Sequence, residues 1–491
     1  MPSFRVDKTD FLKGNNSYTN YPDGGFLSAT VGANPFSKPG LITQAPALGN
    51  SVDSSLPQNG VIAWATGYGA STPTTIALMN PGSKQASWKF VNPSSGAITV
   101  AAGSDSTFGR TYDIGLSDMV FYNAKIYTSV MDDIVEMNID GTGQLLTWWT
   151  VTKGKAAMTA TVPHPMLVYE SILYIADGRY LHKVDGTTAT SQVFDCPPNY
   201  VITAMTEYNG LIYLVAEPYL NFTGVTHGGA MMFSWDGTTE SWFEQYFINY
   251  RVNAMYVYKN RLFMWTNQFV GQWDGSKIVP LKSVSNQVFK CHITEISDSM
   301  VYADGQTIIR FGAPFIPGAS ERFYNYLSSG IGNNWTGIIS LQNNNLIAVE
   351  SALGPTISTS ESKNYYISNL NTPTSSGFRI LNFNPRFFNK PVKVKRVVVH
   401  MEQLGSATIY PWYIDDRSNL IESSADIAPT YKSGIITSSD SDMNGRTTFD
   451  FDFGSKYATR SIQPRLYIFN NPHIRSIDFF YEPVEITIPR P

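Results

Sequence analysis

The chain has few of the residues that carry most protein chemistry. It contains 2 cysteines and 6 histidines in 491 residues. Two cysteines exclude a disulfide scaffold, so Cys196 and Cys291 are expected to be separate small residues of a core. No two histidines stand at the spacing of a metal-ligand pair. A Gly-x-Ser-x-Gly elbow, a phosphate-binding glycine loop and a dinucleotide fingerprint are also missing. The sequence therefore predicts no enzymatic activity and no cofactor.

Long apolar runs and helical periodicity are missing as well. No uninterrupted apolar stretch reaches the roughly 18 residues that a membrane-spanning helix needs, so we expect no membrane span. The first residues, Met1 to Lys8, contain no apolar run and do not resemble a signal peptide, which predicts folding in a cytoplasm. Apolar residues nowhere recur with the period of an amphipathic helix. The chain is therefore expected to be nearly all β.

No part of the chain has a large excess of positive charge. The net charge is −4, and it divides into −6 over residues 51–385 and +1 in each flanking segment. Proteins that bind nucleic acid tightly normally carry a basic surface, because their phosphate contacts release counterions. Tight binding of DNA or RNA is therefore disfavoured. A surface past which DNA slides without binding remains compatible with this charge.

What the chain does contain is a repeat of short strands. Aromatic residues make up 13% of the sequence, and 38 glycines and 28 prolines supply turns. Five apolar strands end on an aromatic residue, at steps of 47, 39, 50 and 39 residues. These marks are Tyr127, Tyr174, Tyr213, Phe263 and Tyr302. Asp-Gly pairs, which favour hairpin turns, close four of the repeats at Asp140, Asp185, Asp236 and Asp274. This spacing predicts an irregular β-propeller of about seven blades, with six or eight left open.

Composition divides the chain into three expected parts. Residues 1–50 are polar and turn-rich and are expected to form an extended arm that docks on its own propeller or on a neighbour, with a disordered leader as the alternative. Residues 51–385 carry the repeat. Near residue 386 the period ends, and residues 386–491 predict a C-terminal β-sandwich, jelly-roll-like, with Phe449 opening a strictly alternating strand.

A weak candidate for a metal site lies in the C-terminal part. Asp440, Asp442 and Asn444 supply oxygen atoms at positions one, three and five of a calcium loop, and Gly445 follows. The bidentate glutamate expected at position twelve is replaced by Phe451. A plain acidic turn is therefore the competing interpretation, and no metal is expected.

Two clusters are candidate partner contacts. An insertion in the repeat contains Arg322, Phe323, Tyr324 and Tyr326, and long loops on a rigid scaffold often carry contacts. A short basic run enters the C-terminal part, with Lys390 followed by the candidate residues Lys393, Lys395 and Arg396. The competing interpretations are burial of the aromatic residues in a core and charged protection of an edge strand.

The arrangement of the chain resembles the hub or nozzle proteins in the tails of short-tailed bacteriophages. The resemblance covers the arm ending near Lys38-Pro39-Gly40, the irregular propeller, and a closing domain with the segments 394–399 and 461–466. It implies a structural subunit of a homo-oligomeric ring, most often a hexamer, that continues the DNA channel below portal and adaptor. Such a ring retains the packaged DNA, lets it pass without sequence-specific binding and carries fibres or a needle. The implied location is the virion tail, assembled in the host cytoplasm.

Two alternatives stay open from the sequence. The first is a carbohydrate-binding, receptor-binding propeller of a virion, in which Trp148-Trp149 or Tyr324 and Tyr326 would be stacking platforms. The second is a glycoside-active propeller with carboxylates in its central funnel. Burial in a core or a subunit contact is the simpler interpretation of the same aromatic residues.

Overall fold

The computed structural model places its strands in two compact units. One unit comprises Met1–Ala47, Thr307–Ser328 and Asn369–Pro491, and the other comprises Leu48–Gln306 and Ser329–Ser368. The predicted domain boundaries at residues 50 and 385 stay predictions. The structure describes residues 1–7, 33–34, 43–44, 61–68, 73–79, 87–92, 98–100, 116–130, 133–138, 146–147, 158–159, 161–186, 188–219, 229–239, 241–296, 298–313, 320–328, 333–341, 345–352, 363–367, 378–382, 386–402, 408–415, 447–452, 458–469 and 473–484.

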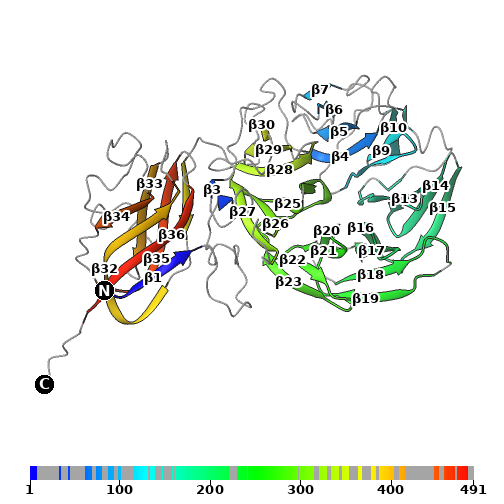
Figure 1. Ribbon diagram of the computed structural model, residues 1–491. Coiled ribbons are helices and arrows are strands. Elements are labelled where there is room, and N and C mark those ends of the chain that lie inside the picture. Colours follow the sequence, from blue (N-terminus) through cyan, green and yellow to red (C-terminus); the bar gives the residue numbers. More distant parts are fainter. Residues whose placement is uncertain are drawn as a thin grey trace. The chain divides into compact units, whose positions relative to one another are not determined.

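The repeat predicted from the sequence forms a series of small antiparallel sheets (Figure 1). The first three have four strands each: β4 (Val61–Tyr68), β5 (Pro73–Met79), β6 (Ser87–Val91) and β7 (Ile98–Val100); β8 (Met119–Tyr122), β9 (Lys125–Val130), β10 (Asp133–Asn138) and β11 (Leu146–Thr147); β12 (Met166–Tyr169), β13 (Ile172–Asp177), β14 (Tyr180–Asp185) and β15 (Thr188–Asp195). Each sheet is an up-and-down meander, so its strands follow the order of the chain.

The series continues with the same topology. The next sheets are β16 (Tyr200–Tyr208), β17 (Leu211–Pro218), β18 (Ala230–Trp235) and β19 (Glu244–Ile248); β20 (Val252–Tyr258), β21 (Arg261–Thr266), β22 (Phe269–Trp273) and β23 (Ile278–Ser283); β24 (Ile293–Ile296), β25 (Ser299–Asp304), β26 (Thr307–Gly312) and β27 (Arg322–Ser328); and the three-stranded β28 (Asn333–Ser340), β29 (Leu346–Ala352) and β30 (Lys363–Ile367). A short 3₁₀ helix, η3 (Lys290–His292), precedes β24, and β2 (Ala33–Asn34) pairs with β3 (Thr43–Gln44). The described residues contain no α-helix. The fold is all-β, as predicted, and is compatible with a propeller.

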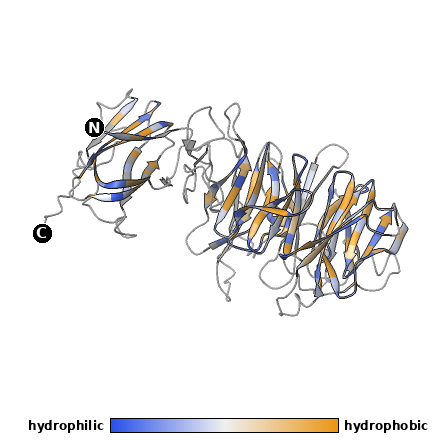
Figure 2. Ribbon diagram, turned by 90° about the horizontal axis from the view of Figure 1, so that it is seen from below, coloured by the Kyte–Doolittle hydropathy of each residue, from blue (hydrophilic) through white to orange (hydrophobic). Residues whose placement is uncertain are grey.

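The five aromatic residues that mark the repeat lie at equivalent places in their sheets. All five occupy the second strand of their sheets, in β9, β13, β17, β21 and β25, and all are buried. A large ring on the second strand packs against the neighbouring sheet. Tyr174, for example, meets Trp235 edge-on at 5.7 Å between ring centroids, and Trp265 meets Tyr302 at 5.4 Å. Figure 2 shows apolar and polar stretches alternating along the strands, as expected for sheets that pack face to face. The periodic aromatic pattern is therefore a pattern of contacts between sheets.

The hairpin turns differ in part from the sequence expectation. The turns with two left-handed residues join the first and second strands, and four of them are described: Asn123-Ala124, Glu170-Ser171, Asn209-Gly210 and Lys259-Asn260. The Asp-Gly pairs lie between the third and fourth strands, where Gly186, Gly237 and Gly275 have positive φ. Asp185 pairs with Thr188, so the turn at Gly186 is a two-residue turn as predicted, whereas the loops at Gly237 and Gly275 are longer. Asp140 lies outside the described residues.

The other unit is built on a seven-stranded sheet. Its strands are β1 (Ser3–Asp7), β31 (Phe378–Asn382), β32 (Arg386–Met401), β33 (Thr408–Asp415), β34 (Thr448–Asp452), β35 (Thr459–Phe469) and β36 (Ile474–Pro483). One layer has the order β1-β36-β32-β34 and the other has the order β31-β35-β33, and β32 joins the two by pairing with β35. Valines of β32 and isoleucines of β35 and β36 meet in a common core. The strands predicted after residue 386 are all present.

The start of the chain belongs to this sheet. Strand β1 pairs antiparallel with β36, so that Phe4 lies opposite Phe479 and their rings stack at 5.1 Å. Arg5 Nε donates to Asp478 Oδ1 at 2.7 Å, and His400 Nε2 lies 3.0 Å from Asp478 Oδ2. The first residues of the predicted arm are therefore an edge strand of the C-terminal sheet, a place that the sequence did not indicate.

Candidate functional site at the centre of the repeated sheets

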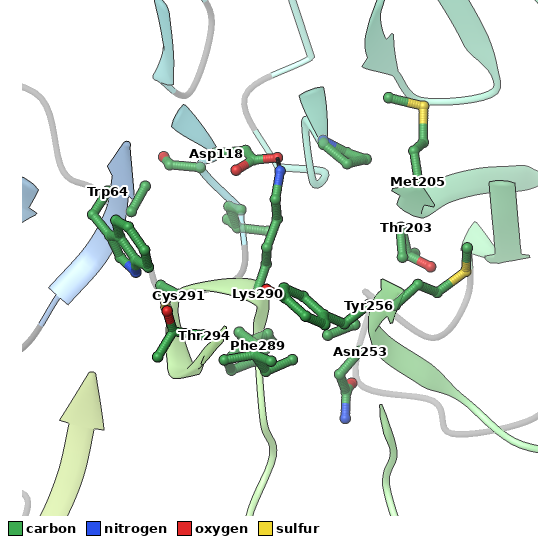
Figure 3. A pocket seen from close by; sticks show the side chains of 18 residues that line it. Trp64, Asp118, Thr203, Met205, Asn253, Tyr256, Phe289, Lys290, Cys291 and Thr294 are labelled. Atoms are coloured by element: carbon green, nitrogen blue, oxygen red, sulfur yellow. Dashed lines mark hydrogen bonds and ion pairs between the residues drawn. The ribbon is translucent and has the colours of Figure 1, made fainter. Parts of the chain in front are cut away.

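The first strands of consecutive sheets surround a cavity of about 200 Å³. Its wall is formed by β4, β16, β20 and β24, by η3, and by the segment before β8 (Figure 3). Apolar side chains dominate, among them Trp64, Met205 and Tyr256. Polar groups enter at a few positions, of which Asp118 and Lys290 carry charge. A central position, a largely apolar wall and a few convergent polar groups make this cavity the first candidate for a functional site.

The charged pair of the cavity joins three elements that are distant in sequence. Lys290 extends from η3 toward Asp118 (Figure 3), and its Nζ lies 2.6 Å from Asp118 Oδ2 and 3.1 Å from the carbonyl oxygen of Met166. The Asp118 carboxylate also accepts the N–H groups of Met119 at 2.8 Å and Met166 at 2.9 Å. Asp118 is 9% exposed, so these contacts compensate for its desolvation. The carboxylate thereby ties the sheet of β8 to the sheet of β12.

Similar carboxylates occur in other sheets, at the ends of their second strands. Glu217, fully buried at the end of β17, accepts the N–H of Val252 at 2.8 Å, and Arg251 lies 3.1 Å from its other oxygen. Asp304 ends β25 and accepts the N–H groups of Ser285 at 2.7 Å and Asn286 at 2.9 Å. In each case the acceptor binds the backbone of the segment that connects two sheets, which satisfies donors that no strand ladder can use.

Burial controls the protonation of the groups around the cavity. Burial raises the pKa of the Cys291 thiol, and it raises the pKa of the Tyr256 hydroxyl together with the charge of Glu295. Both groups therefore stay neutral, and Cys291 is not an activated nucleophile. Burial lowers the pKa of His292, next to the cavity on η3, to about 4. The neutral ring accepts the N–H of Phe289 at Nδ1, at 3.3 Å. The groups that titrate near neutral pH in water are thus held uncharged here.

The aromatic candidates of the insertion lie in the protein interior. Tyr324 and Tyr326 of β27 are 1% and 0% exposed, and Phe323 is buried against Phe311 at 4.5 Å between ring centroids. Arg310 lies over the Tyr326 ring at 5.3 Å. A stacking platform for a ligand needs an exposed face, so these rings correspond to the core interpretation. Arg322, on the same strand, is half-buried.

The basic candidates of the C-terminal part do not protect an edge. They lie on β32, which stands between β36 and β35 in the sheet, so the edge-strand interpretation is wrong. Lys395 Nζ pairs with Glu482 at 3.1 Å, Arg396 lies over the Phe480 ring at 5.4 Å, and Lys393 stands opposite Glu482 in the register. Their heads line one face of the sheet next to acidic and aromatic neighbours.

The remaining candidates fall outside the described residues. Asp440, Asp442 and Asn444 belong to this group, as do Trp148 and Trp149. Within the part of the chain that the structure describes, no group of three or more His, Cys, Asp or Glu side chains could hold a metal ion. No helix among those residues is long and apolar enough to cross a membrane.

The sequence analysis missed the residues that define the centre. Asp118 and Lys290 carry no motif, and their 172-residue separation leaves no local signal. The carboxylates after the aromatic marks do leave one, because Asp177, Glu217 and Asp304 follow Tyr174, Tyr213 and Tyr302 by three, four and two positions. An acidic residue two to four positions after the aromatic residue is therefore a local signal that the sequence analysis could have used.

No known protein family matches the sequence, and no curated protein matches it. Three solved structures are examples of a weak likeness to this chain. The extracellular domain of a protein assigned as a one-component system of B. thetaiotaomicron has 9% identity and a TM-score of 0.30, over 64% of this chain and 52% of that one. The chain thus spans about half the length of that protein.

A luciferin-regenerating enzyme has 9% identity and a TM-score of 0.34, over 50% of this chain and 88% of its own. The exo-beta-1,3-galactanase of Phanerochaete chrysosporium has 9% identity and a TM-score of 0.32, over 89% of this chain and 100% of its own. All three TM-scores lie below 0.5, so none of these likenesses bears on the activity of this chain.

Proposed function

We propose that this chain is a structural subunit of a bacteriophage tail, of the hub or nozzle type. In this proposal several copies form a ring, most often a hexamer, below the portal and adaptor. The ring continues the DNA channel, retains the packaged genome and carries fibres or a needle. Its location is the virion, after assembly in the host cytoplasm, and it has no catalytic role.

We further propose that the repeated sheets close into a propeller of seven blades. Two observations support closure. The first strands β4, β8, β12, β16 and β20 contact one another in succession, and β20 contacts η3, the short helix that leads into β24. Strand β24 contacts β28, and β28 of the last sheet contacts β4 of the first. Val61, Ala77 and Val91 of the first sheet share one apolar cluster with Ile347 and Val349 of the last. The Gly337 backbone of β28 approaches Val61 so closely that a side chain there would collide with it. A closed ring of sheets is a rigid body suited to building a larger assembly.

The observation that carries the structural proposal is the use of charge at the centre. The Asp118 carboxylate and the Lys290 ammonium bind each other and the backbone of β8 and β12. A catalytic carboxylate has to change its protonation or its partners during a reaction. The Asp118 carboxylate already has two backbone N–H groups and an ammonium as partners, which favours a scaffold. The negative net charge of residues 51–385 also suits a conduit along which DNA moves without adhering.

Electron microscopy of particles from which the gene has been deleted tests the proposal. We expect tails that end just below the adaptor and capsids that lose their DNA, with both defects corrected by the wild-type gene supplied in trans. Mass measurement of the purified native assembly gives the number of copies in the ring. Complete tails with normal DNA retention and a loss of host attachment alone would reject the ring and favour a receptor-binding propeller.

A further inference from the structure

A second cavity, of about 500 Å³, shares no lining residue with the central one. It is lined by the turn between β13 and β14, by the middle of β14 and β15, and by the segment that leads into β16. Its size falls within the range of roughly 300–1,000 Å³ that is typical of small-molecule sites. Nothing in the proposed tail function uses this cavity.

The frame of the cavity is fixed by backbone hydrogen bonds, one of them between two sheets and two within a sheet. The N–H of Cys196 donates to the carbonyl of Arg179 at 2.8 Å, and the N–H of Ile202 donates to the carbonyl of Gly178 at 2.8 Å. The N–H of Tyr219 donates to the carbonyl of Asn199 at 2.7 Å. These bonds hold the tip of one hairpin against the start of the next sheet. The cavity is therefore formed before any ligand arrives, which reduces the entropy that binding would cost.

Backbone strain that the hairpins do not explain is concentrated here. Apart from glycine, the described residues with positive φ are nine, and seven of them belong to the tight turns between first and second strands. The other two are Gln192, with φ 55°, and Asn199, with φ 66°, and both line this cavity. At Gln192 the pairing of β14 with β15 shifts register. A left-handed glutamine inside a strand costs on the order of 1 kcal/mol, and such strain collects at functional sites.

The charges of the lining are already balanced. Arg179 Nη2 pairs with Asp195 Oδ2 at 2.7 Å, and its guanidinium lies 4.9 Å from the centre of the Tyr180 ring. Asp177 Oδ1 accepts the N–H of Thr159 at 2.9 Å. A phosphate or carboxylate ligand would meet no uncompensated cation among these groups. The cavity therefore favours a ligand without net charge.

The other side chains of the lining suit a ligand with many hydroxyl groups. Ser191, Gln192 and Asn199 are exposed and offer both donors and acceptors. The rings of Tyr200 and Tyr219 stand at the rim, and Tyr219 is 41% exposed. The negative face of an aromatic ring attracts the positive C–H groups on the face of a sugar. Amides and hydroxyls that bind the edges of a ring, together with aromatic rings that cover its faces, are the chemistry of saccharide recognition.

We propose that this cavity binds a neutral saccharide, with Gln192 and Asn199 on its hydroxyl groups and Tyr219 against a sugar face. The source is the end of a surface glycan or a free sugar of the same structure. This binding does not depend on the tail function, because the cavity shares no lining residue with the central cavity. A ring subunit with this cavity would hold a sugar at a fixed position on the assembly.

Binding to a glycan array of the purified full chain is the first measurement. A neutral saccharide that binds is then titrated calorimetrically, and competition between the free sugar and the immobilised chain identifies the source. Gln192→Gly removes the side chain and also relieves the left-handed strain, so the variant should fold at least as well as wild type. Tyr219→Ala removes an exposed ring. We expect each variant to lose affinity tenfold or more.

Two matched controls should keep wild-type affinity. Lys259→Gly is the same kind of change as Gln192→Gly, at a left-handed residue in a turn that does not line the cavity. Phe247→Ala removes a ring that is 76% exposed on β19, also outside the cavity. The proposal is overturned if no neutral saccharide binds, if only anionic glycans bind, or if Gln192→Gly and Tyr219→Ala bind like wild type. None of these outcomes changes the expected phenotype of the gene deletion, so the two proposals fail separately.

Discussion

Asp118 and Lys290 contribute unequally to the centre of the molecule although they bind each other. The Asp118 side chain is 12% exposed, whereas that of Lys290 is 48% exposed. Without the carboxylate, two backbone N–H groups and a cation lose their acceptor in a buried position. Without the ammonium, the carboxylate keeps both N–H donors. The Asp118 carboxylate is therefore the main connection between the two sheets, and the partly exposed Lys290 adds to it.

The first prediction follows from this asymmetry. Asp118→Ala should lower the free energy of unfolding by about 2–4 kcal/mol, because buried donors are left without an acceptor. Lys290→Met should lower it by less than about 1 kcal/mol, as is usual for a partly exposed ion pair. Urea unfolding measures both, and Lys277→Met, an exposed lysine elsewhere, is the control. Equal effects of the two central substitutions would contradict the larger contribution of Asp118.

His292 gives the second prediction, on pH. Its pKa is about 4 in the folded protein and 6.5 in water, because burial disfavours the charged ring. Between these values the unfolded chain binds more protons, so stability is fully present above pH 6.5 and is lost as the pH falls toward 4. The total loss is on the order of 3 kcal/mol.

Asn in place of His292 keeps an acceptor for the N–H of Phe289 and does not titrate in this range. Thermal unfolding of wild type and His292→Asn between pH 7 and pH 4 compares the two slopes. The variant is expected to have the flatter profile, and parallel profiles would show that His292 does not set the acid sensitivity.

The aromatic marks could be found from the sequence because a large ring on a short apolar strand leaves a local signal. The buried carboxylates that accept backbone N–H groups are of two kinds. Glu217 and Asp304 follow their marks closely and could have been recognised with them. Asp118 could not, since its partners Met166 and Lys290 are contributed by other sheets and only the folded chain brings them together.

The turns of the sheets hold left-handed residues that are poorly suited to them. Asn and Gly adopt positive φ with little strain, and Asn209-Gly210 is the pair that a sequence rule would select. Glu170-Ser171 adopts the same conformation, with φ of 48° and 63°, although neither residue favours it. Pairing of β12 with β13 on both sides imposes the turn, so the sheet overrides the preference of the residues.

Ser171→Gly is the third prediction. It should raise the stability by about 0.5–1 kcal/mol, because glycine reaches the left-handed region without a steric penalty. Ala189→Gly, in β15 of the same sheet, is the matched control and should lower stability by a similar amount, since its backbone is that of an ordinary strand. Differential scanning fluorimetry detects both shifts. A loss of stability in Ser171→Gly would mean that the serine side chain supports the turn.

The positions of strands could be predicted from the sequence, but the pairing between strands could not. Alternation and aromatic residues marked the strands of the C-terminal sheet, including the one that contains Phe449. The Asp-Gly pairs indicated turns but not which strands they joined. The length of the third connection differs between sheets, from two residues after Asp185 to a longer loop after Asp236.

Two strands far apart in the sequence, β1 and β36, pair in the C-terminal sheet. Strand β1 covers an edge of the C-terminal sheet that would otherwise expose the backbone groups of β36. Contacts of this kind leave no sequence signal, because Arg5 and Asp478 are 473 positions apart. The sequence could separate an arm from a sandwich, and it could not reveal that the arm begins as part of that sandwich.

The fourth prediction is the effect of removing residues 1–7. The β36 edge becomes available for pairing with another chain, and the rings that Phe4 covers become exposed. We expect concentration-dependent association, measured by sedimentation velocity, and a lower unfolding temperature of the C-terminal sheet. Arg5→Ala keeps the strand and removes only its ion pair with Asp478, so this control should sediment like wild type. A truncated chain that sediments like wild type would show that β1 does not protect the edge.

The pairing of β1 with β36 also determines when the C-terminal sheet can form during biosynthesis. The first strand leaves the ribosome when almost the whole chain is still unmade, and at roughly 5–20 residues per second its partner follows on the order of half a minute later. During that interval the repeated sheets are translated and can fold, while β1 has no strand to pair with. Strand β1 therefore gains its partner only when β36 has been made, after the repeated sheets between them.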